Sequence, residues 1–202
     1  MPNDTKPLFD LPCVIFAGGK SSRMGRNKAL LPFGGASTLV EYQYARLSPL
    51  FAKTYVSAKT AEPFPDTLPL IPDDPAIEDF APTAGFVSAF RALSGERIFA
   101  LSVDTPFVDA GIIAALIAAD REDLDAVIAR TGTGQHPLCG LYHRSLLPRF
   151  EAMAATGDHK LGKLLQNSNV VYVDFENEEH FANLNHPHEY AAALKKMQKE
   201  KY

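Results

Sequence analysis

The 202-residue sequence contains no apolar run long enough to cross a membrane. Residues 1–10 are polar and are interrupted by prolines, so they do not resemble a signal peptide. Cysteine is scarce: Cys13 and Cys139 lie in apolar segments, where buried thiols are expected rather than a disulfide. These absences argue against membrane-spanning and disulfide-rich secreted classes, and we expect a protein of the reducing cytoplasm with no membrane partner.

The sequence has little excess charge of either sign. Its net charge at pH 7 is −4, which argues against general binding of nucleic acid. It has no internal repeat and no low-complexity segment. A hydrophobic content of 46% and a charged content of 22% are ordinary for a globular protein, and 202 residues suffice for one well-buried core. We therefore expect a single domain spanning residues 1–202.

Short apolar segments alternate with segments of helical periodicity along the chain. Residues 97–103 are nearly all apolar, as expected for a strand covered on both faces, whereas residues 84–93 carry apolar side chains along one helical stripe. This alternation predicts an α/β fold, a three-layer sandwich around a mostly parallel central sheet. The expected strands cover residues 11–16, 52–58, 67–71, 97–103, 125–129, 137–142 and 170–175. The expected helices cover residues 38–47, 84–93, 109–119, 144–154, 159–166 and the segment from Pro187.

Acidic residues are missing from one stretch, since none lies between Asp10 and Glu41. Its segment 16–28 connects the first strand to a helix and contains three glycines and four cations: Gly18, Gly19, Gly25, Lys20, Arg23, Arg26 and Lys28. Glycines let backbone N–H groups approach an anion, and a following helix N-terminus adds favourable partial charge. The segment matches neither the G-x-G-x-x-G fingerprint nor a P-loop ending in G-K-[ST]. It predicts a polyphosphate site at the end of the first strand, with a solvated surface loop as the alternative.

Two acidic positions follow expected strands. Asp104 comes directly after the most apolar strand, where a carboxylate can hold Mg²⁺ together with substrate phosphates. The alternative for Asp104 is a helix cap, a role for which Asp109 is better placed. Asp73 follows the third strand, within a segment that in isolation predicts an ordinary turn. Right-handed crossovers bring the segment 16–28, Asp73 and Asp104 to one edge of the sheet, and the proline-bounded connection 76–83 is long enough to suggest a functional loop.

Residues 17–28, Ala-Gly-Gly-Lys-Ser-Ser-Arg-Met-Gly-Arg-Asn-Lys, resemble the G-G-x-S-x-R-M-G-x-x-K signature of the molybdenum cofactor guanylyltransferase family, which has a Rossmann-like nucleotidyltransferase fold. The resemblance extends through most of the chain. Residues 104–107 are similar to the family's D-x-P-[FY] element, residues 136–142 to H-P-x-x-x-L-Y, and residues 181–189 to F-x-N-x-N-T-P-E-E. The chain departs from the family pattern at four positions. Asn27 stands where the family often has aspartate and Ser57 where it often has asparagine, while His186 and His188 replace the threonine and the glutamate of the last element.

The resemblance implies a Mg²⁺-dependent transfer of GMP from GTP to the terminal phosphate of molybdopterin, molybdenum-bound or metal-free, with release of pyrophosphate. It implies that residues 11–107 bind the nucleotide, that residues 125–190 bind the acceptor, and that molybdenum insertion proteins or molybdoenzyme chaperones are transient partners. The family's nucleotide-binding positions correspond to Ala17, Gly18, Gly19, Lys20, Ser21, Arg23, Met24, Gly25, Lys28, Ser57, Asp73, Gly85 and Asp104. Its catalytic positions correspond to Arg23, Lys28 and Asp104, its metal positions to Asp104 and Asn185, and its acceptor positions to His136, Asn183 and Asn185.

Two other functions stay open. A related transferase would use CTP, or a sugar phosphate as acceptor, but the Gly18-Gly19 pair favours guanine because cytidylyl relatives generally have alanine at the first position. A nucleotide-binding regulator would keep the fold without turnover. The joint presence of Lys28, Asp104 and Asn185 argues against a regulator.

Single residues also have alternative roles. His136 is either a structural histidine or a contact to the pterin, and Asn185 either reaches the metal and phosphates or caps the last helix. Asp73 accepts hydrogen bonds either from guanine or from ribose. A zinc site built from His136, His186 and His188 would have a spacing that matches no known ligand pattern.

Overall fold

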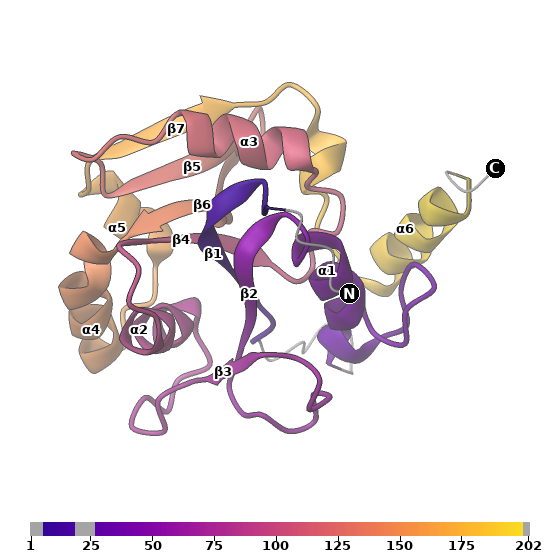
Figure 1. The fold of residues 1–202 in the computed structure, drawn as a ribbon, viewed down its shortest axis with the longest axis horizontal. Helices are drawn as coiled ribbons and strands as arrows, with labels where there is room; N and C mark the ends of the chain where they lie inside the picture. The colour runs from indigo at the N-terminus through magenta and orange to yellow at the C-terminus, as the bar shows by residue number, and fades with distance from the viewer. Residues whose placement is uncertain (1–5, 19–26, 200–202) are drawn as a thin grey trace.

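The computed structural model describes residues 6–18 and 27–199, which form a seven-stranded sheet with helices on both faces (Figure 1). The strands are β1 (Phe9–Phe16), β2 (Phe51–Ala58), β3 (Leu70–Pro72), β4 (Arg97–Ser102), β5 (Ala126–Thr131), β6 (Gly134–His143) and β7 (Val170–Asp174). The α-helices are α1 (Leu39–Leu47), α2 (Pro82–Ala92), α3 (Ala110–Ala118), α4 (Leu147–Thr156), α5 (Leu161–Gln166) and α6 (Pro187–Lys199). Three short 3₁₀ helices are η1 (Lys28–Leu30), η2 (Arg144–Leu146) and η3 (Glu178–Phe181).

The strands lie in the order β3-β2-β1-β4-β6-β5-β7. Strand β1 pairs in parallel with β2 and β4, β2 with β3, and β5 with β7. Strand β6 is antiparallel to both of its neighbours, because a turn at Gly132 and Thr133 returns the chain directly beside β5. The mostly parallel α/β sandwich predicted from the sequence is therefore confirmed, and the reversed strand β6 is an addition to it.

Helices cover both faces of the sheet, which creates two apolar cores. Helices α1 and α3 pack on one face, where α6 also contributes Ala193, and helices α2, α4 and α5 pack on the other. In the second core the rings of Phe86 and Phe150 stack at 4.4 Å between centroids, so α2 and α4 are joined by aromatic contact. Cys13 and Cys139 are buried free thiols, as predicted, and burial raises the pKa of both.

The carboxyl ends of the parallel strands are joined by backbone hydrogen bonds. The N–H of Ala17 donates to the carbonyl of Ser57 at 2.8 Å, and the N–H of Val103 donates to the carbonyl of Phe16 at 3.0 Å. Beyond them, the N–H of Asp73 donates to the carbonyl of Ala58 at 2.9 Å. The segments after β1, β3 and β4 therefore meet at one edge of the sheet, as the crossover argument predicted.

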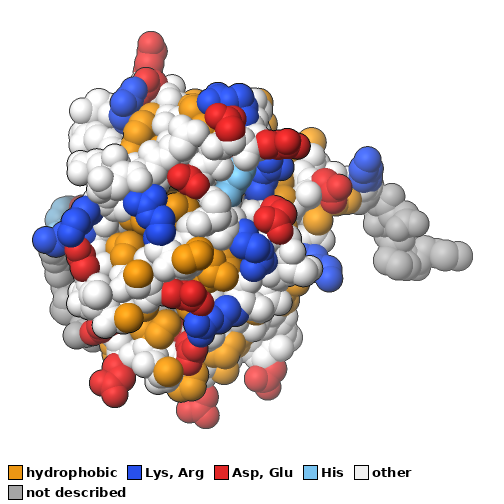
Figure 2. All heavy atoms as spheres, turned by 90° about the vertical axis from the view of Figure 1, so that its left-hand side faces the viewer, with side chains coloured by type: hydrophobic (Ala, Val, Ile, Leu, Met, Phe, Trp, Pro, Cys, Tyr) orange, Lys and Arg blue, Asp and Glu red, His pale blue; other side chains and the backbone are white. Residues whose placement is uncertain are grey.

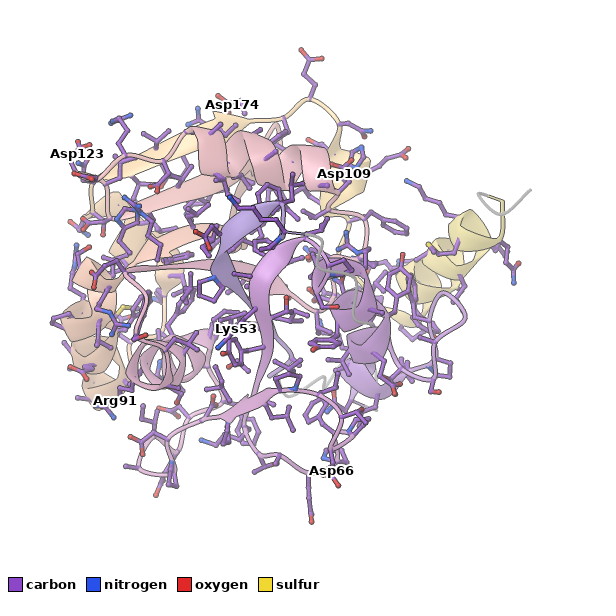
Figure 3. All side chains as sticks on the ribbon, viewed as in Figure 1. Lys53, Asp66, Arg91, Asp109, Asp123 and Asp174 are labelled. Carbon is purple, nitrogen blue, oxygen red and sulfur yellow. The ribbon has the colours of Figure 1, made fainter. Side chains whose placement is uncertain are left out.

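Side chains cap the first turns of two helices. Thr38 Oγ1 accepts a hydrogen bond from the N–H of Glu41 at 3.2 Å at the start of α1. Asp109, which is labelled in Figure 3, accepts one at Oδ1 from the N–H of Ile112 at 2.9 Å and so caps α3, as expected from the sequence. Because Asp109 caps α3, Asp104 is left for another role.

Charged side chains of both signs are mixed on the face that Figure 2 shows, between small apolar patches. Arg91 on α2, for example, pairs with Asp74 at 2.6 Å and with Glu151 at 2.8 Å. Such exposed pairs contribute little to stability. In the part of the chain that the structure describes, no helix is both long enough and apolar enough to cross a membrane.

Candidate active site

Three polar side chains from distant parts of the sequence meet beside the ends of β1 and β4. The ammonium group of Lys28 donates hydrogen bonds to Asp104 Oδ2 and, at 3.0 Å, to Asn185 Oδ1. Ser102 Oγ donates to Asp104 Oδ1 at 2.5 Å. Asp104 is only 6% exposed, so its carboxylate is held between a hydroxyl and a cation, away from bulk water.

Hydrogen bonds to the local backbone fix the positions of the cluster residues. Asn27 Oδ1 accepts from the N–H of Ala29 at 3.1 Å and caps η1, whose first residue is Lys28. The N–H of Leu184 donates to the carbonyl of Asp104 at 3.0 Å, which holds the segment before α6 against the end of β4. Asn185 is thereby brought to the cluster.

The side chain of Asn185 accepts from Lys28, and Glu189 holds the start of α6 instead. Glu189 Oε2 accepts hydrogen bonds from the N–H groups of Asn185 at 2.7 Å and His186 at 2.8 Å. Burial raises the pKa of Glu189, but these backbone hydrogen bonds help to bring it below its ordinary value. The contact with Lys28 favours the site interpretation of Asn185 over the capping alternative.

The same cluster has the donor set that a hard divalent cation prefers. Asp104 Oδ2 and Asn185 Oδ1 converge on one cationic group, the Lys28 ammonium, so two oxygens already share a cation. Mg²⁺ binds through one or two protein oxygens and completes its octahedral shell with water and phosphate oxygens. The residues present therefore fit Mg²⁺. Within residues 6–18 and 27–199, no group of three or more His, Cys, Asp or Glu side chains is arranged to hold a metal, so the three-histidine zinc alternative fails.

A pocket of about 190 Å³, here called the small pocket, opens beside the ends of β1, β2 and β3. Four of the predicted nucleotide-binding residues line it: Gly18, Ser57, Asp73 and Gly85. Its other walls come from Phe16, Lys59, Phe80, Ala81, Pro82 and Leu138. The small pocket thus combines apolar walls with a few polar groups, which is typical of a site for a heteroaromatic base.

Gly85 allows α2 to lie directly against β1 and β2. A Cβ atom at this position would lie 2.5 Å from Ser57 Oγ and 2.9 Å from Cε1 of Phe16. Both distances are shorter than real Cβ contacts, so a larger residue would force α2, Ser57 or Phe16 to shift. The glycine therefore sets the shape of the small pocket.

The carboxyl group of Asp73 is half-buried in the wall of the small pocket. Burial raises its pKa to about 6 from an ordinary value of 3.8, and the nearby charge of Lys59 offsets part of this effect. Lys59 is itself oriented by a hydrogen bond to the carbonyl of Ile77. The ionisation of Asp73 is consequently sensitive to any hydrogen-bond donor that enters the pocket.

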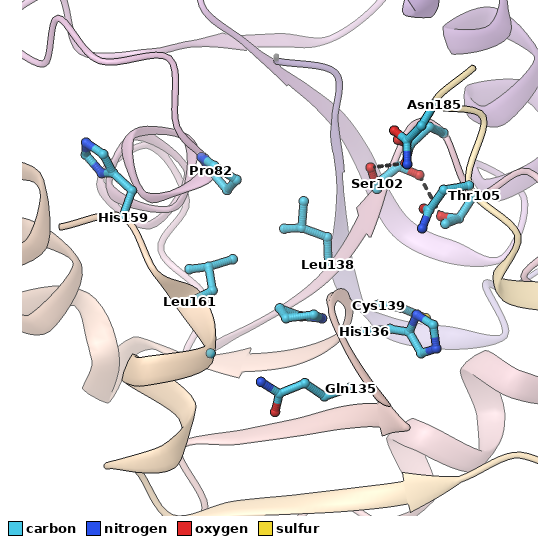
Figure 4. A pocket seen from close by; sticks show the side chains of 14 residues that line it. Pro82, Ser102, Thr105, Gln135, His136, Leu138, Cys139, His159, Leu161 and Asn185 are labelled. Atoms are coloured by element: carbon cyan, nitrogen blue, oxygen red, sulfur yellow. Dashed lines mark hydrogen bonds between the residues drawn. The ribbon is translucent and has the colours of Figure 1, made fainter. Parts of the chain in front are cut away.

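A larger pocket of about 460 Å³, the large pocket, lies on the other side of Pro82 and Leu138, which line both cavities (Figure 4). Its walls contain four predicted site residues: Asp104, His136, Asn183 and Asn185. Leu184, between the two asparagines, is buried, so Asn183 and Asn185 share one face as the alternating pattern predicted. Asp104 and Asn185, which both contact Lys28, thus form part of the wall of the large pocket.

His136 is fixed in the large pocket by its surroundings. Its ring stacks on Phe181 at 4.5 Å between centroids, and its Nε2 lies 3.0 Å from Thr131 Oγ1. Burial lowers the pKa of His136, so the imidazole is neutral at pH 7. A neutral imidazole ring that is held in one orientation can donate or accept a hydrogen bond with a molecule bound in the pocket.

Several residues of the two pockets were not predicted from the sequence. Gln135 and His159 line the large pocket, and Lys59 and Phe80 line the small one. None belongs to a spaced motif, so only the three-dimensional structure places these side chains at the site. The predicted phosphate-contacting residues Gly19, Lys20, Ser21, Arg23, Met24 and Gly25 lie outside the described residues. Ala17 lies at the end of β1 and is buried.

A family model and full-length relatives match this sequence. Residues 13–173 match the family model described as a MobA-like NTP transferase domain. The chain is 36% identical to the molybdenum cofactor guanylyltransferase of Campylobacter jejuni subsp. doylei over 91% of this chain and 95% of that protein. It is 35% identical to the molybdenum cofactor guanylyltransferase of Helicobacter pylori strain P12, with 96% of each chain covered.

Solved structures share the fold. Molybdopterin-guanine dinucleotide biosynthesis protein A from Archaeoglobus fulgidus superposes with a TM-score of 0.79 at 20% identity, over 94% of this chain and all of that one. A Mycobacterium tuberculosis protein solved in complex with manganese superposes with a TM-score of 0.66 at 16% identity, over 92% of this chain and 98% of that one. On the family model and the full-length relatives together, the chain belongs to the MobA-like NTP transferase family.

Proposed function

We propose that the chain is a molybdenum cofactor guanylyltransferase, which transfers GMP from GTP to the terminal phosphate of molybdopterin. The curated relatives that carry this name match it along nearly their whole length. The observation that carries the proposal is the Lys28, Asp104 and Asn185 cluster, two residues of which line the large pocket, while the small pocket adjoins the large one across Pro82 and Leu138. A transferase needs such an arrangement, because two substrates must bind side by side with the reacting phosphates between them.

The small pocket would bind the nucleoside and the large pocket the acceptor. Except for Leu138, the small pocket is lined by residues up to Gly85, whereas most of the large pocket comes from residues after Asp104. This division supports the expected nucleotide-binding part, residues 11–107, and acceptor-binding part, residues 125–190. In the small pocket, Asp73 would accept hydrogen bonds from guanine N–H groups or from ribose hydroxyls.

The reaction is a substitution at phosphorus. An oxygen of the acceptor phosphate forms a bond to the α-phosphorus of GTP. The bond from that phosphorus to the oxygen that bridges the α- and β-phosphates breaks, and pyrophosphate leaves with the electron pair. Because the attacking oxygen is already anionic, the chain needs no general base. Lys28 would stabilise negative charge on the phosphates, and the two pockets would hold the reacting groups in line.

Asp104 and Asn185 are the residues that would hold Mg²⁺. A bound divalent cation would neutralise charge on the phosphate oxygens. A protein of the same fold has been solved in complex with manganese, which supports a divalent cation site in this fold. The contribution of the chain is a buried carboxylate, oriented by Ser102, with an amide oxygen beside it.

Incubation of the purified protein with molybdopterin, Mg²⁺ and either GTP, CTP or ATP tests this function. We expect pyrophosphate and a product with the mass of the guanine dinucleotide from GTP alone. Equal or faster reaction with CTP would make the chain a cytidylyl transferase. A parallel set of incubations replaces molybdopterin with a sugar phosphate, and turnover only in that set would identify another acceptor. Nucleotide binding without product in any mixture would favour the regulator.

A further inference from the structure

His159 joins two segments that are far apart in the sequence. Its Nε2 lies 2.9 Å from Asp79 Oδ2, and its Nδ1 lies 2.5 Å from Thr83 Oγ1. Asp79 belongs to the connection before α2 and Thr83 to the first turn of that helix, whereas His159 precedes α5. The three side chains therefore form a latch between the nucleotide-binding and the acceptor-binding parts of the chain.

An aspartate, a histidine and a hydroxyl in this order also occur where a hydroxyl acts as a nucleophile. That role is excluded here by burial, because Thr83 has no exposed surface for a substrate to reach. The side chain of Asp79 is 60% exposed, so its charge is screened by solvent. The latch thus acts through directional hydrogen bonds rather than through a reactive group.

The latch lies where the two pockets adjoin. His159, Leu161 and Pro82 lie on one side of the large pocket and Asn185 on the opposite side (Figure 4). Pro82 also lines the small pocket, and so does Phe80, the neighbour of Asp79. A shift of His159 would therefore move the wall that the two pockets share.

We propose that His159 is a positioning residue, which fixes the distance between the bound nucleotide and the bound acceptor by holding Asp79 and Thr83. This inference rests on the proposed function. Loss of the latch loosens the shared wall but removes neither Asp73 from the small pocket nor Asp104, His136 and Asn185 from the large one, so each substrate alone still binds. Only the alignment of the two reacting phosphates is lost, and small misalignments slow such reactions strongly.

The variant His159→Ala tests the latch, and the fold should tolerate it. Helices α2 and α4 remain joined by the stacked rings of Phe86 and Phe150, which do not depend on His159. His159→Asn is the conservative variant, because its side-chain oxygen can still accept a hydrogen bond from Thr83. His188→Ala is the matched control, since His188 is exposed at the start of α6.

Two measurements decide the inference. Hydrogen exchange of backbone amides should become faster in residues 76–83 and 157–162 of His159→Ala, and remain as in the parent for His188→Ala. The kcat of His159→Ala should fall roughly ten- to hundredfold, while the Kd of GTP and that of molybdopterin, each measured alone, change less than about threefold. His159→Asn should regain part of the lost kcat.

Each contrary result has one meaning. Unchanged exchange in both segments shows that the latch does not hold them, and unchanged kcat shows that it does not position the substrates. A large rise in the Kd of molybdopterin alone makes His159 a direct contact instead. If the parent protein forms no dinucleotide, the proposed function fails, and the exchange measurement still decides whether the latch exists.

Discussion

At the scale of single residues, Lys28 does not behave as part of a solvated surface loop, the alternative that the sequence left open. Its side chain is 18% exposed and contacts both Asp104 and Asn185. We expect Lys28→Ala to reduce turnover about ten- to hundredfold, because a charge-assisted contact to phosphate contributes roughly 1.5–3 kcal/mol. Steady-state kinetics at saturating GTP measure this loss.

Thermal melts of the same variant provide a second readout. Without Lys28 the carboxylate of Asp104 keeps the hydrogen bond from Ser102 but loses the one from the Lys28 ammonium group. The variant should therefore melt at a lower temperature than the parent. Added Mg²⁺ should raise the melting temperature of the variant by more than it raises that of the parent. Lys53→Ala, at an exposed position on β2 (Figure 3), is the control and should change neither value. Kinetics like those of the parent would leave Lys28 without a role in transfer.

Asp73 predicts a pH dependence of nucleotide binding. Its pKa is raised to about 6, so between pH 5 and pH 7 the side chain changes from mostly protonated to mostly ionised. Because the ionised form accepts hydrogen bonds from the nucleoside, GTP affinity should rise across this range and then level off. Asp73→Asn should bind GTP more weakly at pH 7 and lose the pH dependence. Titrations of GTP at several pH values test this, and an identical dependence in the variant would assign it to another group.

The effect of Asp73 on folding has the opposite sign. A folded-state pKa above the ordinary value of 3.8 means that folding disfavours the charged form. The contribution of Asp73 to the free energy of unfolding is therefore greatest below pH 4 and declines as the pH rises towards 6. Asp73→Asn should remove this decline, which denaturant unfolding at pH 4 and pH 7 can detect.

Gly18 is the residue on which nucleotide choice can be tested with least disturbance. Among residues 6–18 and 27–199, a Cβ atom at this position would meet no atom within 4 Å, so Gly18→Ala should melt like the parent. We expect its preference to move from GTP towards CTP, because the added methyl group enters the small pocket. Competition between the two nucleotides at fixed Mg²⁺ measures the shift. An unchanged preference would remove Gly18 from the determinants of guanine selection.

At the scale of secondary-structure elements, the contact of α2 with the sheet predicts the result of Gly85→Ala. The new Cβ atom would overlap Ser57 and Phe16, so α2 or these two side chains must shift, at a cost of roughly 1–3 kcal/mol in the free energy of unfolding. GTP binding should weaken in parallel, since the helix forms a wall of the small pocket. Gly95→Ala is the control, because its nearest contact would be 3.5 Å away. A variant that melts and binds like the parent would show that α2 is not seated as closely as described.

The same scale shows what the sequence could predict and what it could not. Strand β4 was predictable because its side chains are nearly all apolar, and α1 and α3 because Thr38 and Asp109 can cap helices. The antiparallel direction of β6 was not predicted. The apolar pattern of a strand shows which side chains face the core, and this pattern is the same whether the strand runs parallel or antiparallel to its neighbours. The turn at Gly132 and Thr133 was the available signal, because a two-residue connection joins only antiparallel strands.

At the scale of the whole molecule, the positions of some site residues could be predicted from the sequence and those of others could not. Lys28, Asp104 and Asn185 lie beside strand ends that the topology brings together, so their meeting followed from the order of elements and the family resemblance. His159 reaches the site only because α4 packs on α2 and returns the chain to the connection before α2. No local pattern marks that contact, and its discovery required the packed structure.

Asp104→Asn tests most directly whether guanylyl transfer depends on the Asp104 carboxylate, which we propose holds Mg²⁺. The exchange keeps the size of the side chain and removes its charge, and Lys28, partly exposed, can turn to solvent, so the fold should persist. Formation of the guanine dinucleotide should be followed by mass at increasing Mg²⁺ concentrations, with thermal melts and GTP binding on the same preparation. We predict a folded variant that binds GTP and forms almost no dinucleotide at low Mg²⁺. A variant that melts normally and matches the parent in turnover at low Mg²⁺ would contradict the account.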